Sequence, residues 1–105
     1  MLALSGDKPV DKEQKDLHHI VAKKAARAAA ARLVLKAVDI GINSAENTME
    51  VIRALHQRLH TDAYYKYVNA TVDTAYGGGK GNARTRVVGA LNTIRSRIRN
   101  MEGAL

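Results

Sequence analysis

The sequence predicts an all-α protein in which about four helices pack in a bundle-like arrangement. No segment alternates apolar and polar residues for long enough to indicate a strand. Glycines divide the chain into pieces of helical length, and only one proline is present. Within each piece, apolar residues recur at helical spacing. At 105 residues, the chain has room for one domain, which we expect to span residues 1–105.

The first predicted helix is the longest and runs from residue 10 to residue 40. Pro9 suits its first turn, and no breaker occurs before Gly41. Alanine dominates residues 22–31, and two opposite sides of this helix are apolar, so both sides need a covering partner. That partner lies either within one four-helix domain or in a second copy of the chain. The lean core favours a homo-oligomer or a larger assembly. The residues predicted at this contact are Ala26, Ala29 and Leu33.

Three shorter helices are predicted to follow, over residues 43–60, 63–76 and 82–101. Residues suited to N-caps precede or open them, namely Asn43, Thr61 and Asn82. The connector Gly77–Gly81 separates the last two helices and is either a hinge or an anion site.

Positive charge is concentrated in the last predicted helix and the connector before it. Lysine and arginine number 17 against 10 acidic residues, a net charge of +7, and residues 80–105 hold six bases and one acid. Arginine suits bidentate phosphate contacts. We therefore predict that one basic flank contacts nucleic-acid phosphates and that the other faces an acidic protein or subunit. The first set is Lys80, Arg84, Arg95 and Arg99, and the second is Arg86 and Arg97.

Candidate catalytic and metal-binding residues are sparse. His56 and His60 are one helical turn apart, but Asp62 is the one carboxylate at a possible ligand spacing, and a His-Glu-x-x-His motif is absent. On a helix, His18 and His19 would point in different directions. The glycine-rich connector lacks the hydroxyl residue and the preceding strand of a P-loop. We therefore expect no metal, no cofactor and no catalytic residue, and thus no enzyme.

These observations favour a small basic protein that binds DNA or RNA through phosphates without reading bases, or that scaffolds a nucleoprotein. One alternative is a helical structural subunit of a phage particle, a secretion filament or a large complex. Another is an adaptor that docks on an acidic protein. The lack of cysteine fits a reducing, cytoplasmic setting, and no apolar run is long enough to span a membrane.

Overall fold

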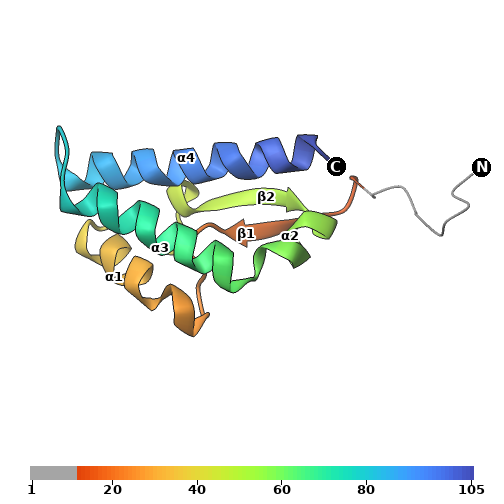
Figure 1. Ribbon diagram of the computed structural model, residues 1–105, viewed down its shortest axis with the longest axis horizontal. Helices are drawn as coiled ribbons and strands as arrows, with labels where there is room; N and C mark the ends of the chain where they lie inside the picture. Colours follow the sequence, from red (N-terminus) through yellow and green to blue (C-terminus); the bar gives the residue numbers. More distant parts are fainter. Residues whose placement is uncertain (1–11) are drawn as a thin grey trace, which may run out of the picture.

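The structure is a computed structural model that describes residues 12–105, which fold into helices packed around a two-stranded antiparallel sheet (Figure 1). The predicted all-α class is therefore wrong, because the fold mixes helices and strands. In chain order the elements are β1 (Lys15–His19), the 3-10 turn η1 (Ala26–Ala28), α1 (Ala29–Ala37), the 3-10 turn η2 (Ala45–Asn47), β2 (Thr48–Ile52), α2 (Arg53–Leu59), α3 (Asp62–Gly77) and α4 (Ala83–Gly103).

The long helix predicted over residues 10–40 is replaced by a strand, a loop and the short helix α1. Its predicted start at Pro9 lies outside the described residues. In β1, the side chain of Leu17 is 60% exposed whereas His18 is only 1% exposed, the alternation of a half-buried strand. Pairing with β2 outweighs the modest helix propensity of this segment, because tertiary packing overrides a weak local preference.

Helix α1 ends before Gly41, where the sequence predicted its end. Asp39 has the left-handed φ of 60°. The amide of Ile40 donates to the carbonyl of Leu35 at 2.9 Å, and the Asp39 amide donates to Lys36 at 3.2 Å. This is the hydrogen-bond pattern of a Schellman cap, in which an aspartate takes the position usually given to glycine.

The single helix predicted over residues 43–60 is replaced by a 3-10 turn, a strand and the short helix α2. Thr48–Ile52 form β2, in which Met49 and Val51 are buried while Glu50 is exposed. Helix α2 begins only at Arg53, directly after the strand. A five-residue strand is too short to show a clear period against the surrounding helical pattern, which is why the sequence did not reveal it.

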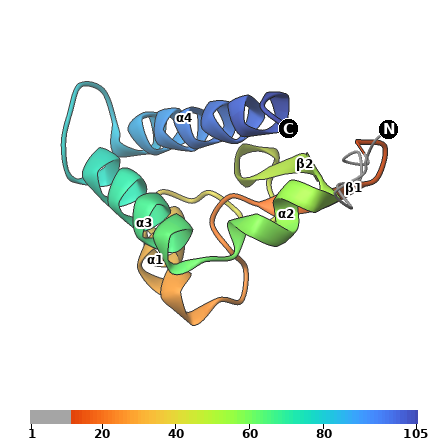
Figure 2. The same cartoon turned by 45° about the vertical axis from the view of Figure 1, so that its right-hand side comes forward.

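The last two predicted helices are confirmed as α3 and α4, which lie side by side in the views of Figures 1 and 2. Each begins at the predicted cap. The Thr61 hydroxyl accepts from the amide of Tyr64 at 3.2 Å, and the Asn82 side chain accepts from the amide of Thr85 at 2.8 Å. The apolar seam of α4 is buried in the core at Val87, Leu91, Ile94 and Ile98.

Helix α4 also closes the outer edge of the sheet. Alternate residues of β2 turn their backbone polar groups away from β1, and an unpaired edge of this kind invites pairing with another chain. Side chains of α4 satisfy these groups instead. The bonds run from Arg95 to the carbonyl of Thr48 at 3.2 Å, from Arg99 to that of Glu50 at 2.7 Å, and from the Ile52 amide to the Glu102 carboxylate at 2.7 Å.

Within residues 12–105, no helix combines the length and the apolar character needed to cross a membrane.

We expect Arg95→Ala to lower the free energy of unfolding by about 1–3 kcal/mol, because it removes a charged donor that bonds to three backbone carbonyls. Arg84→Ala is the matched control, since Arg84 makes an ion pair with Glu46 at the surface, and its loss should be smaller. Urea denaturation followed by circular dichroism measures both. Equal losses in the two variants would contradict the role given to Arg95.

Candidate metal centre

Three histidines from two distant segments of the chain meet beside the sheet. His18 lies on β1, His56 lies on α2, and His60 follows the last residue of that helix. Each offers a ring nitrogen to a common point, and these nitrogens all lie within 4.8 Å of one another. The ring centroids of His18 and His56 are 5.2 Å apart, and those of His56 and His60 are 5.0 Å apart. Because β2 runs directly into α2, the pairing of the strands fixes His18 relative to the helix.

The hydrogen bonds of His18 determine which of its nitrogens is free. The Tyr64 hydroxyl donates to the carbonyl of Ile20 at 2.7 Å, so its oxygen accepts from Nε2–H of His18 at 2.8 Å. Nδ1 then carries the lone pair. It is buried and has no hydrogen-bond partner among the described residues. Buried polar atoms without a partner are uncommon, and this one fits a metal ligand.

Neighbouring side chains orient the other two imidazoles. The Asp16 carboxylate accepts from Nδ1 of His56 at 3.1 Å and from Arg53 at 3.1 Å, which orients the ring of His56 so that Nε2 points away from the carboxylate. These two contacts hold the pKa of the Asp16 carboxyl below its usual value. Nδ1 of His60 lies 2.9 Å from the Tyr65 hydroxyl, and its Nε2 faces Nε2 of His56 at 3.3 Å.

Burial favours the neutral form of His18 and His60, which is the form that ligates a metal. Burial lowers the pKa of His18 to about 3, with His56 and His60 adding to the effect. Burial and the neighbouring His56 also lower the pKa of His60. Neutral imidazoles suit Zn²⁺ and similar transition ions, whereas Mg²⁺ prefers oxygen ligands. Three protein ligands leave a coordination position for substrate or water, as catalytic zinc sites do.

His19 lies next to the cluster but belongs to a different hydrogen-bond system. Its Nε2 donates to the side-chain carbonyl of Asn43 at 2.8 Å, so Nδ1 is free to accept a proton. It lines a pocket of about 330 Å³ together with His56 and His60. The His19 imidazole thus opens onto the same pocket as two histidines of the cluster.

Asn47 fixes the backbone that carries His18 and His19. Its side chain is fully buried, accepting from the amide of Val21 at 2.8 Å and donating to the carbonyls of Val21 and Ile42 at 3.1 and 2.9 Å. Asn47 thereby ties the loop after β1 to the loop before β2. The sequence analysis missed Asp16, Asn43 and Asn47, because their roles depend on pairing between distant segments.

The sequence predicts no metal at His56 and His60, because no third ligand is evident near them. The strand pairing, which the sequence did not reveal, brings His18 close as a possible third ligand. The adjacency of His18 and His19 was the signal that could have found the site, since neighbours on a strand face opposite sides and perform separate roles.

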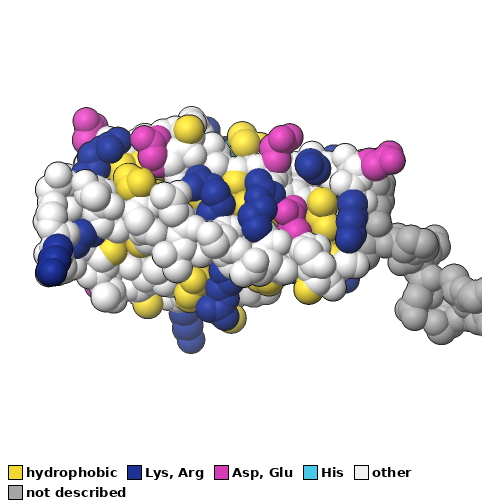
Figure 3. Space-filling model, turned by 90° about the horizontal axis from the view of Figure 1, so that it is seen from above, with side chains coloured by type: hydrophobic (Ala, Val, Ile, Leu, Met, Phe, Trp, Pro, Cys, Tyr) yellow, Lys and Arg dark blue, Asp and Glu magenta, His cyan; other side chains and the backbone are white. Residues whose placement is uncertain are grey.

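The residues predicted to bind phosphates lie on or near α4, away from the histidine cluster. Figure 3 shows the face that carries α4, where basic and acidic side chains are interspersed. Arg84 pairs with Glu46, and the guanidinium groups of Arg95 and Arg99 bond to backbone around β2. Lys80 is exposed in the connector. Phosphate binding by these four residues stays a prediction.

The residues predicted at partner contacts are placed as follows. Arg86 donates to carbonyls at the end of α3 and in the connector, and Arg97 lies 4.7 Å above the ring of Tyr67. A Cβ on Gly79, whose φ is 128°, would lie 2.6 Å from the Arg86 side chain, so this position requires glycine. The other residues predicted at a partner contact are exposed on η1 and α1, namely Ala26, Ala29 and Leu33. Their contact with a partner stays a prediction.

A cluster of imidazoles that can hold a transition ion, beside a further imidazole that lines the same pocket, is a type of site found in metal-dependent hydrolases. Residues 1–98 match the model of a nuclease family of the HNH/ENDO VII superfamily with a conserved Ala-His-His motif, and the chain belongs to this family. His18-His19 is the one pair of adjacent histidines, and Leu17 precedes it in place of alanine. No curated protein and no solved structure matches the chain.

Family membership corrects the function inferred from the sequence. The expectation of a protein without enzymatic activity, whether a binder, a structural subunit or an adaptor, is wrong, because the family is one of nucleases. The expectation that nucleic acid is a partner agrees with the family, because a nuclease acts on nucleic acid.

We expect the free energy of unfolding of the metal-free protein to fall as the pH is lowered from about 6.5 towards 4.5. Above the unfolded pKa of His18, near 6.5, both states hold it neutral; below it, only the unfolded state takes up the proton. The loss should reach about 2 kcal/mol from His18, with His60 acting in the same direction. Urea denaturation in a chelator measures it. His18→Gln should flatten the dependence, and an unchanged slope in that variant would contradict the assignment.

Proposed function

We propose that the protein hydrolyses phosphodiester bonds of nucleic acid, with His18, His56 and His60 holding a divalent transition ion and His19 acting as the general base. The proposal rests mainly on the approach of ring nitrogens of His18, His56 and His60 to within 4.8 Å of one another, beside the pocket that His19 lines. Nδ1 of His18 is buried there without a hydrogen-bond partner among the described residues. When bound, the ion supplies Lewis-acid stabilisation of the charge that develops on the phosphate and the leaving oxygen.

His19 provides the proton acceptor for the attacking water. In hydrolysis, a water oxygen forms a bond to phosphorus, the bond from phosphorus to the leaving oxygen breaks, and the water gives up a proton. Nδ1 of His19 receives that proton, because Nε2–H is already committed to Asn43. The leaving oxygen takes a proton from solvent. Asn43 acts here as a positioning residue, since it fixes both the tautomer and the direction of the ring.

The surroundings of the pocket favour a polyanionic substrate. The residues that line it include Lys23 and Lys24 and no carboxylate. The net charge of +7 attracts nucleic acid of either type over longer distances. DNA and RNA therefore both belong in the assay.

We expect His19→Ala to lower kcat by about 10²–10⁴-fold on single-stranded DNA, duplex DNA or structured RNA, whichever the wild type cleaves in the presence of Zn²⁺, Mn²⁺ or Ni²⁺. His19 is half-buried near the surface, so the variant should retain the melting temperature of the wild type within a few degrees. Arg58→Ala, at an exposed position on α2 outside the pocket, is the matched control and should retain activity. Full cleavage by the His19 variant would contradict the general-base role.

A further inference from the structure

Basic side chains near the histidine cluster differ from those on α4 in being free to meet a ligand. The guanidinium groups of Arg86, Arg95 and Arg99 are occupied by backbone carbonyls, and Arg84 is paired with Glu46. By contrast, Lys23 and Lys24 are exposed and form no ion pair with any other described residue. The charge available next to the cluster therefore comes from the loop after β1.

Both lysines line the pocket that also contains His19, His56 and His60. No carboxylate lines the pocket, so the two ammonium groups give it an uncompensated positive charge. Arg53 and Asp16, which lie behind His56, neutralise one another outside the pocket lining. An anion at the histidines would meet further positive charge on the side formed by Lys23 and Lys24.

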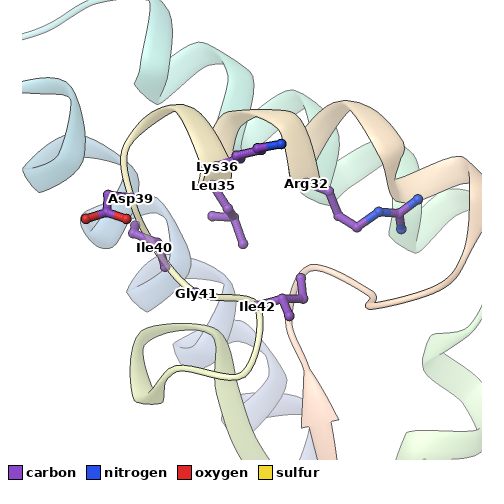
Figure 4. A pocket seen from close by; sticks show the side chains of 7 residues that line it. All are labelled: Arg32, Leu35, Lys36, Asp39, Ile40, Gly41 and Ile42. Atoms are coloured by element: carbon purple, nitrogen blue, oxygen red, sulfur yellow. The ribbon is translucent and has the colours of Figure 1, made fainter.

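The loop that carries the lysines is held at both ends. Arg32 on α1 donates through one nitrogen to the carbonyl of Ala22 at 2.9 Å and to that of Ala25 at 2.6 Å. These two residues directly flank the lysine pair. Asn47 holds the preceding residue, Val21, through both its amide and its carbonyl. Figure 4 shows the Arg32 side chain extending from α1. Ordering of the loop before binding reduces the entropy lost when a ligand is captured.

We infer that Lys23 and Lys24 form a phosphate subsite that holds a backbone phosphate of the nucleic acid adjacent to the one being cut. The inference rests on the proposed function and deepens it by placing the substrate on the β1 side of the cluster. Lysine ammonium groups bind phosphates as point charges without reading bases, so the subsite contributes affinity without sequence preference. Arg32 is a positioning residue, since it touches the loop and leaves the phosphate to the lysines.

The test compares two double variants that each remove two positive charges. Lys23→Gln/Lys24→Gln removes the subsite. Lys36→Gln/Lys66→Gln is the control, because Lys36 lines the separate pocket at the end of α1 in Figure 4 and Lys66 lies on α3. Binding of a fluorescent oligonucleotide is measured by anisotropy in a chelator, between about 50 and 200 mM salt. The log–log salt slope should fall by about 1–2 units for the subsite variant and less for the control.

Kinetics with added metal provide the second measurement. The lysines contact a phosphate that does not react, so the subsite variant should raise KM several-fold and change kcat by no more than about threefold. Salt slopes that are equal in the two double variants would overturn the inference. If the wild type cleaves while its slope is independent of Lys23 and Lys24, the subsite is wrong and the nuclease function stands. If the lysine-dependent slope is found without cleavage under any metal, the subsite stands and the proposed function fails.

The positioning of the lysine loop by Arg32 is tested separately with Arg32→Gln. The amides of Val21 and Ala28, which are hydrogen-bonded at the two ends of the loop, should exchange hydrogen faster than in the wild type. The oligonucleotide affinity should fall part of the way towards that of the subsite variant. Unchanged exchange at these amides would overturn the positioning role of Arg32.

Discussion

The antiparallel pairing of β1 with β2 is the interaction on which the candidate site depends. It sets His18 opposite Met49 and thereby within reach of α2, which continues directly from β2. Since neighbouring side chains of a strand point to opposite faces, a slip of one residue would turn His18 outward and His19 inward. The separate roles proposed for the two histidines therefore require this one register. Two contacts beyond the strands secure it: the Ile20 amide donates to the Asn47 carbonyl, and the Arg53 amide donates to Gln14.

Two short strands form a sheet of marginal stability, so the rest of the molecule supports them. Tyr64 on α3 holds His18, and the side chains of α4 cover the outer edge of β2. Much of the arginine that makes the chain basic is thus engaged within the fold itself. Lysine, which is more strongly hydrated and more loosely held, supplies the charge that faces the pocket. In a chain with a net charge of +7, part of the positive charge is therefore hydrogen-bonded within the fold, and another part stays exposed to a ligand.

Local signals predicted the second half of the fold well and the first half poorly. Helix caps and apolar seams depend on residues close together in the sequence. The structure confirms the caps Thr61 and Asn82 and the seam of α4. Strands β1 and β2 are stabilised by each other across a long stretch of chain, so neither is visible in its own five residues. The candidate site likewise combines residues that are close in the sequence with one that is distant. The spacing of His56 and His60 was apparent in the sequence, whereas His18 joins them only through the strand pairing.

The central claim is that imidazoles from β1 and α2 form one metal centre, and titration of the metal-free protein with Co²⁺ tests it most directly. We expect the protein to bind one Co²⁺ ion per chain and to show a visible absorption spectrum typical of nitrogen ligands in a low-coordinate site. His18→Ala should abolish this spectrum, because it removes the ligand that the strand pairing contributes. The absence of stoichiometric binding, or a spectrum that persists unchanged in His18→Ala, would contradict the account.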